Sequence, residues 1–279
     1  MLRKLRKLRS TALFAAVAAL GLLATAAPAH AIVGGTDDTD NRYAAVGALQ
    51  ASVGDGRFPV FCSGTLIRPD VVLTASHCLD FFGAPPGDPG LGVDDLSVSF
   101  AVGSDESAAG HAAERIVLHP QWLGASPGVG NSKQRYLSPG HEDIALVFLK
   151  APVQGVTPAP VAGPGYLDGL DLDSVTLTAA GYGTDAYVTG SAGSPRAVSI
   201  FDGVRSYRDV SVIDARDAFP DRFVKITKSV CFGDSGGPLF HGDTVVGINT
   251  WTFSYRCDGP NLEYRTDSAP AQAFLDANL

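Results

Sequence analysis

Residues 231–239 read Cys-Phe-Gly-Asp-Ser-Gly-Gly-Pro-Leu, and the serine in this stretch, Ser235, could act as a nucleophile. Glycines let the backbone turn tightly and let other atoms approach closely. A serine held in such a turn can present its hydroxyl beside backbone N–H groups that stabilise an oxyanion. An ordinary surface turn has a similar composition, so the interpretation depends on partners elsewhere in the chain.

A serine nucleophile needs a base and a carboxylate that orients the base. His77 is the best candidate base, because it follows an apolar, β-branched run and precedes a cysteine. Asp143 is the best candidate for the orienting acid, because it stands at the start of the apolar run 144–149 and a buried acid needs a partner. The alternatives are a packing histidine and an acid that caps a strand or lies in a turn.

The remaining acids and histidines lie in less specific sequence contexts. We expect Glu142 to be an exposed turn acid, and Asp234 is either a second acid trapped beside the nucleophile or a turn-forming residue. Four further histidines occupy polar or turn contexts and are expected to be solvated; they are His111, His119, His141 and His241.

The first 31 residues differ in composition from the rest. They hold five basic residues, an apolar run and the small-x-small sequence Ala29-His30-Ala31, which is typical of a cleaved secretory signal peptide. An uncleaved membrane anchor is the alternative, although the apolar run is short for a span. Cleavage leaves 248 residues and lowers the net charge from −8 to −13, which disfavours nucleic acid and anionic lipid as partners. We therefore expect an extracellular protein with no membrane association after cleavage.

Short strands dominate the predicted secondary structure. The 279 residues are 45% hydrophobic and include 32 Gly and 18 Pro, which favours an all-β sandwich or barrel. A turn at 68–70 predicts a hairpin, and the Ala-rich residues 269–278 predict a terminal helix. Segments 82–93 and 124–140 are predicted loops. The predicted strands are 44–53, 60–67, 71–75, 96–102, 115–118, 144–149, 174–180, 198–205, 207–213, 222–227 and 244–250.

Four cysteines allow three disulfide pairings, and export permits them to form. The two short-range pairs are Cys62 with Cys78 and Cys231 with Cys257. Each would close a modest loop, worth about 3 kcal/mol in the chain-entropy model. A metal site is disfavoured because the chain contains no C-x-x-C spacing.

Five stretches, in the order in which they occur, together resemble the chymotrypsin/trypsin family of serine proteases, from residue 32 almost to the end of the chain. They are Ile32-Val33-Gly34-Gly35, Leu73-Thr74-Ala75-Ser76-His77-Cys78, Asp143-Ile144-Ala145-Leu146, Gly181-Tyr182-Gly183 and Gly233-Asp234-Ser235-Gly236-Gly237-Pro238. The resemblance implies an endopeptidase that forms an acyl-enzyme on Ser235. It implies that His77 is the general base and then acid, that Asp143 orients it, and that the N–H groups of Gly233 and Ser235 form the oxyanion hole.

The resemblance also implies a fold. We expect two antiparallel Greek-key β-barrels with a short C-terminal helix, at residues 32–150 and 161–279, joined by a linker at 151–160. The same two disulfides are expected. The implied partners are peptide or protein substrates and proteinaceous inhibitors, for a monomer that needs no cofactor and no metal.

Members of this family are activated by an ion pair between a freed N-terminal amine and the acid before the nucleophile. The corresponding residues here are Ile32 and Asp234. Because Ala31 directly precedes Ile32, signal cleavage itself could create that amine without a separate zymogen. Cleavage a few residues away, or a further processing step, is the alternative.

Specificity follows from residues at matching pocket positions. Ser229 lies at the expected base of the primary pocket and is not acidic, which disfavours cleavage after Arg or Lys. The neighbouring pocket segment is Thr250, Trp251 and Thr252, and Thr252 narrows the pocket where the family often has Gly. The opposite wall falls at Asn261, Leu262 or Glu263; Leu262 would narrow the pocket further and Glu263 could add charge. We expect small or medium apolar side chains before the cleaved bond, with large aromatics second.

Two functions from other classes remain open. The sequence around Ser235 also fits the G-x-S-x-G elbow of α/β-hydrolase esterases, but that fold needs alternating β-α units and a histidine after the serine, and His241 is the only one there. A non-catalytic, protease-like binding protein is the other alternative, because Thr252 and the region near Leu262 depart from the family pattern.

Overall fold

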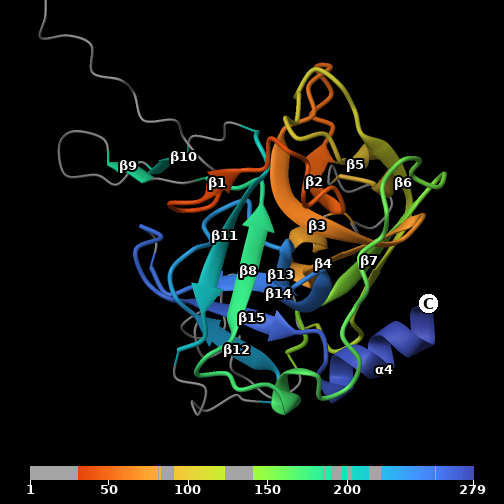
Figure 1. Ribbon diagram of the computed structural model, residues 1–279. Coiled ribbons are helices and arrows are strands. Elements are labelled where there is room, and N and C mark those ends of the chain that lie inside the picture. The colour runs from red at the N-terminus through yellow and green to blue at the C-terminus, as the bar shows by residue number, and fades with distance from the viewer. Residues whose placement is uncertain are drawn as a thin grey trace, which may run out of the picture.

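Two all-β units and a C-terminal helix make up the protein in the computed structural model (Figure 1). The structure describes residues 31–80, 82, 91–122, 141–184, 187–189, 197–199, 203–213, 221–254 and 256–279. The predicted signal peptide, apart from Ala31, and the predicted loop 124–140 lie outside these residues. Most of the predicted loop 82–93 lies outside them as well.

The first unit is a closed six-stranded barrel with strand order β2-β3-β4-β7-β6-β5, and all of its pairings are antiparallel. The predicted hairpin is confirmed, because Thr65 pairs with Leu73 on either side of the turn. The strands are β2 (Val46–Ala51), β3 (Val60–Arg68), β4 (Val71–Thr74), β5 (Leu96–Ser99), β6 (His111–Leu118) and β7 (Ala145–Leu149).

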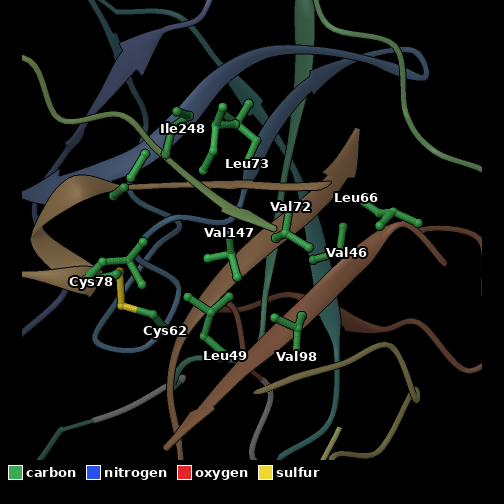
Figure 2. Close-up of a cluster of buried hydrophobic side chains, with 14 of the residues drawn as sticks. Val46, Leu49, Cys62, Leu66, Val72, Leu73, Cys78, Val98, Val147 and Ile248 are labelled. Carbon is green, nitrogen blue, oxygen red and sulfur yellow. A yellow bond between two sulfur atoms is a disulfide. The ribbon is translucent and has the colours of Figure 1, made fainter. Parts of the chain in front are cut away.

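Apolar side chains from these strands fill the barrel interior. Figure 2 shows Leu49, Val72, Val98 and Val147 pointing toward one another, with the Cys62–Cys78 disulfide at one end of the cluster. Alternate residues of each strand face inward, as the period of two requires. Burial of this set is the main force that closes the barrel.

The second unit is a seven-stranded antiparallel sheet with order β1-β11-β8-β13-β14-β15-β12. An antiparallel bridge between Val212 and Ile226 brings the ends of β11 and β12 together, so this sheet also curls round on itself. The expected two-unit, all-β fold is confirmed. The strands are β1 (Thr36–Asp37), β8 (Thr176–Gly181), β11 (Ser206–Ser211), β12 (Phe223–Ile226), β13 (Pro238–His241), β14 (Thr244–Thr252) and β15 (Asn261–Arg265).

Short elements complete the described chain. The predicted terminal helix is present as α4 (Ala269–Asn278), with Ser268 as its N-cap. The helix packs against the first barrel, where the ring centroids of Phe274 and His119 lie 5.2 Å apart. The others are α2 (Ser76–Leu79), the 3-10 turns η1 (Val93–Asp95) and η2 (Leu167–Gly169), and the strand pair β9 (Tyr187–Thr189) and β10 (Ala197–Ser199).

Several details differ from the sequence-based expectations. The strands β9 and β13 were not predicted, and residues 203–205 of the predicted strand 198–205 lie outside the regular strands. His77, two residues after the predicted strand 71–75, lies in the helical turn α2. The strand β15 was not predicted, because Asn261, Glu263 and Arg265 gave it a polar appearance. The short strand β1 pairs with β11, so residues 36–37 belong to the second sheet. The division at residues 150 and 161 stays a prediction.

A buried cation joins the two units. Arg205, fully buried, donates from Nε to Asp38 Oδ2 at 2.7 Å and from Nη1 to the carbonyl oxygens of Val46 and Phe100. Val46 and Phe100 belong to the first barrel, whereas Arg205 precedes β11 of the second sheet. The arginine therefore satisfies polar groups on both sides of the contact.

We expect the substitution Arg205→Met to destabilise the protein strongly, because it leaves Asp38 buried without its cation. Removing one partner of a buried pair costs about 3–5 kcal/mol. Urea unfolding should show a lower midpoint with an unchanged slope. Lys150→Met is the matched control, since Lys150 and Asp94 form an exposed pair and their loss should not move the midpoint. Equal midpoints for Arg205→Met and the wild type would contradict this role.

Candidate active site

The structure brings the predicted base and the predicted orienting acid together. His77 Nδ1 lies 2.7 Å from Asp143 Oδ2, and the His77 backbone N–H donates to Asp143 Oδ1 at 2.9 Å. The Asp143 side chain is fully buried, whereas 18% of the His77 side chain is exposed. The carboxylate thus fixes the ring through one oxygen and the helical turn through the other.

The candidate nucleophile lies beside the same helical turn. The Ser235 carbonyl oxygen accepts a hydrogen bond from Ser63 N–H at 2.8 Å and lies 3.5 Å from Cys78 Sγ. Gly236 has φ +80°, and a Cβ there would collide with Thr74 and Ser63. The glycine is therefore required for the Ser235 loop of the second unit to pack against the first barrel next to His77.

Backbone N–H groups surround Ser235. Gly233 has φ +93°, and its carbonyl oxygen accepts from Ser63 Oγ at 2.9 Å, which fixes the peptide plane. The N–H groups of Gly233 and Ser235 donate to no other residue in the part of the chain that the structure describes. This geometry suits the predicted oxyanion hole, since both donors remain available for a ligand oxygen.

Asp234 is buried and held by backbone donors. Its Oδ1 accepts from Gly183 N–H and its Oδ2 from Cys231 N–H, both at 2.8 Å. Gly181 and Gly183 explain the Gly-Tyr-Gly motif, because a Cβ at either glycine would collide with this carboxylate. Asp234 is thus the trapped acid that the sequence suggested rather than an exposed turn residue.

Ile32 is also fully buried, and the next residue, Val33, donates its N–H to the Ser229 carbonyl oxygen at 2.8 Å. In the described chain Ala31 precedes Ile32, so the Ile32 nitrogen is part of a peptide bond. The ion pair between Ile32 and Asp234 stays a prediction for the processed chain.

The predicted pocket residues line up on two adjacent strands. Trp251 pairs with Leu262, and Thr252 pairs with Asn261, across β14 and β15. Asn261 Oδ1 accepts from the N–H of the fully buried Ser229 at 2.8 Å. Leu262 packs in the core cluster that contains Tyr264, so it lies on the opposite face of β15 from Asn261 and Glu263. The structure therefore places Asn261, and not Leu262, next to Ser229, whereas the Glu263 carboxyl group contacts the Thr250 N–H.

Glu142 was expected to be exposed, and that prediction is wrong. It is 2% exposed, accepts a hydrogen bond from the Tyr264 hydroxyl, and pairs with Arg222 Nη1 at 3.2 Å. Tyr264 and Arg222 belong to the second unit. Glu142, which directly precedes Asp143, therefore links the first unit to the second. No local pattern could reveal this, because its partners lie 122 and 80 residues away in the chain.

Two of the four histidines were also predicted wrongly. His119 and His141 are buried, and His141 packs against the Trp122 ring at a centroid distance of 4.4 Å. His111 is exposed as expected, and His241 is half-buried, with Nδ1 at 2.9 Å from the Tyr166 hydroxyl oxygen. His119 likewise packs against the Phe274 ring, at a centroid distance of 5.2 Å.

Both predicted disulfides are present, Cys62–Cys78 and Cys231–Cys257. His77 and the sulfurs of the first bridge lie close enough together to suggest a metal-binding cluster. Disulfide sulfurs are not thiolates, however, and cysteine binds zinc only as the thiolate. These three residues therefore do not form a metal site.

The pKa of His77 is raised above its ordinary value. Desolvation by burial lowers it, but the charge of Asp143 and the hydrogen bond to that carboxylate outweigh the desolvation. A general base must be neutral to accept a proton. Asp143 therefore makes His77 a stronger base than an isolated histidine.

We expect kcat/KM to fall as the pH is lowered through an apparent pKa above about 6.5, the ordinary value for histidine. The sign follows from the raised pKa, since the neutral form of His77 dominates only above it. The measurement is the pH profile of kcat/KM on a peptide substrate. An acid limb centred below the ordinary histidine value would contradict the geometry described above.

Comparisons with known proteins agree with this geometry. A protein-family model described as Trypsin matches residues 32–275. Trypsin, alkaline B, from Manduca sexta is 30% identical over 86% of this chain and 89% of its own length. Chymotrypsin-like elastase family member 1 from Homo sapiens is 29% identical over 81% of this chain and 83% of its own length.

A solved structure of human heparin binding protein shares the fold, with a TM-score of 0.58 and 19% identity over 88% of this chain and 95% of that chain. At that identity the likeness concerns the fold alone. The named strands of the described residues pair only in the antiparallel sense, which argues against the esterase alternative, because that fold requires a parallel sheet with alternating helices.

Proposed function

Because this chain belongs to the trypsin family of serine proteases, we propose that it is a secreted endopeptidase that cleaves peptide bonds through an acyl-enzyme on Ser235. Its substrates are peptides or proteins. We further propose that it acts as a monomer and that proteinaceous inhibitors can occupy the same site. Among the described residues, no helix has the length and apolar character needed to span a bilayer.

The proposed reaction uses three side chains and two amides. His77 Nε2 accepts the Ser235 hydroxyl proton as the oxygen attacks the substrate carbonyl carbon, and Asp143 stabilises the resulting imidazolium. The N–H groups of Gly233 and Ser235 bind the oxyanion. His77 then protonates the leaving amine, and water hydrolyses the acyl-enzyme by the same steps.

The two hydrogen bonds between His77 and Asp143 carry this proposal. They fix the Nδ1–H tautomer, so Nε2 is the nitrogen that can accept a proton from a hydroxyl. A packing histidine would not need a fully buried carboxylate on both its ring and its backbone. The packing of the Ser235 loop against Ser63 and Cys78 supports the same assignment.

We propose that the residue before the cleaved bond is small or medium and apolar. Ser229 and Asn261 bond to each other, and neither side chain is charged, which supports a preference against Arg and Lys. Trp251 and Thr252 are half-buried on β14 and are proposed to border the same pocket. Leu262 is a weaker candidate, because it packs in the core.

We propose that cleavage after Ala31 frees the Ile32 amine, which then pairs with Asp234. The buried positions of both residues support this pairing. N-terminal sequencing of the exported protein tests it, since a mature chain that starts elsewhere than Ile32 excludes direct activation by signal cleavage.

The experiment that tests the function is labelling of the exported, processed protein with a fluorophosphonate probe, followed by cleavage of a peptide library. We expect stoichiometric labelling and cleavage after small or medium apolar residues. Correctly processed protein that resists the probe would instead favour a non-catalytic binding protein. Cleavage confined to Arg or Lys would overturn the proposed specificity but not the enzyme class.

A further inference from the structure

Two buried oxygen atoms near the Ser235 loop lack hydrogen-bond donors. They are Glu263 Oε1 and Asn249 Oδ1, and both residues are fully buried. Leaving a buried polar atom unsatisfied is costly, so two such acceptors close to a candidate active site require an explanation.

The two residues face each other across the sheet. Asn249 of β14 and Glu263 of β15 are directly opposed Cα partners, so their side chains leave the same face of the sheet. Opposed Cβ atoms in such a pair are about 4.5–5.5 Å apart, within reach for a carboxyl and an amide group. The other oxygen of the acid, Oε2, accepts from Thr250 N–H at 2.9 Å, at a register shift between the strands.

Asn249 in turn fastens the Ser235 loop. Its Nδ2 donates to the carbonyl oxygens of Asp234, at 3.2 Å, and Ala180, at 3.1 Å. Its backbone carbonyl accepts from Gly236 N–H, and its N–H donates to the Gly237 carbonyl oxygen, both at 2.8 Å. One asparagine thus holds the peptides on both sides of Ser235.

We propose that Glu263 is protonated on Oε1 and donates this proton to Asn249 Oδ1, so that a neutral acid–amide pair positions the Ser235 loop. This inference rests on the proposed role of Ser235 as nucleophile. This single proton gives both unsatisfied oxygen atoms, Glu263 Oε1 and Asn249 Oδ1, a hydrogen bond. It also fixes the orientation of the amide group, so that Nδ2 points at the carbonyl oxygens of Asp234 and Ala180.

The electrostatics support a neutral acid. Burial raises the pKa of Glu263 well above its ordinary value; the hydrogen bond from Thr250 N–H opposes this rise, and the negative charge of Asp234 adds to it. If Ile32 supplies one ammonium group to this region, it balances the charge of Asp234 alone. A second buried carboxylate would then be uncompensated, which is strongly unfavourable.

The test uses the processed protein with Glu263→Gln and Glu263→Met. Glutamine can still donate to Asn249 and accept from Thr250, so we expect kcat within about twofold of the wild type. Methionine keeps the volume but removes the donor, so we expect kcat per labelled site to fall about tenfold with KM unchanged. A role in stability alone would lower the amount of folded protein but leave kcat per labelled site unchanged, and that result would overturn the proposal.

Infrared difference spectra test the proton directly. The spectrum of the wild type minus Glu263→Gln should contain the C=O stretch of a protonated carboxyl group at neutral pH. The matched control is Glu142→Gln, which removes a buried acid that already pairs with Arg222 and should show a carboxylate band. A carboxylate band for Glu263, or a selective loss of Lys or Arg cleavage in Glu263→Gln, would overturn the proposal.

Failure of the proposed function gives a different pattern. If the wild type does not react with the fluorophosphonate, Glu263 cannot position a catalytic serine. The infrared band still reports whether Glu263 is protonated. If the wild type reacts and the band is absent, the protease assignment stands and the acid–amide pair is wrong.

Discussion

Replacing Ser235 with alanine is expected to lower kcat by about 10⁶-fold, because the attacking oxygen is removed. Fluorophosphonate labelling should disappear completely. The fold should not change, since the contacts that hold this loop use the Ser235 carbonyl oxygen and not its hydroxyl. The measurements are active-site labelling, peptide hydrolysis and the urea midpoint of the same preparation.

Ser174→Ala is the matched control, because Ser174 is an exposed serine of the second unit, whose Oγ bonds to the nearby Asp171. It should label and cleave as the wild type does. Persistent labelling of Ser235→Ala would show that another nucleophile reacts with the probe, and the role given to Ser235 would then be wrong.

Replacing Asp143 with asparagine is expected to lower kcat by about 10⁴-fold at neutral pH. The asparagine amide can donate to His77 Nδ1 and so favours the tautomer with the proton on Nε2. That tautomer cannot accept the Ser235 proton. Loss of the negative charge also lowers the pKa of His77, so the acid limb of the pH profile should move to lower pH.

Asp80→Asn provides the control for this substitution. Asp80 also carries a negative charge that raises the pKa of His77, but its Oδ1 bonds to Trp122 Nε1 rather than to the imidazole ring. We expect a small shift of the acid limb to lower pH and little change in kcat above it. A loss of activity in Asp80→Asn equal to that in Asp143→Asn would mean that net charge, and not the tautomer, controls the base.

The candidate residues of the proposed reaction could be selected from the sequence because their signals are local. Ser235 stands in a glycine-rich turn, His77 and Cys78 follow a β-branched strand, and Asp143 opens an apolar strand. Each signal lies within a few neighbouring residues, and the close approach of Gly236 to the first barrel shows why the glycines are needed. The Cys62–Cys78 pair could likewise be chosen from its short separation of 16 residues.

The strand β15 shows where local patterns fail. Its five residues are all buried, yet Asn261, Glu263 and Arg265 are polar, so the segment lacks the alternation of a half-buried strand. Those polar groups are satisfied by distant partners, such as Ser229 for Asn261 and Asp168 for Arg265. The same reason explains why Glu142 was placed at the surface.

The amino-acid sequence by itself determined which side chains could perform the chemistry, their order along the chain, and the all-β architecture that positions them. Only the tertiary structure decided the charge environment of the buried acids Glu142 and Glu263. Whether a buried carboxyl group is paired with a cation or held neutral depends on groups that meet it through folding. Those groups are set by strand pairing and by the packing of the two units, and they leave no trace in the neighbouring residues.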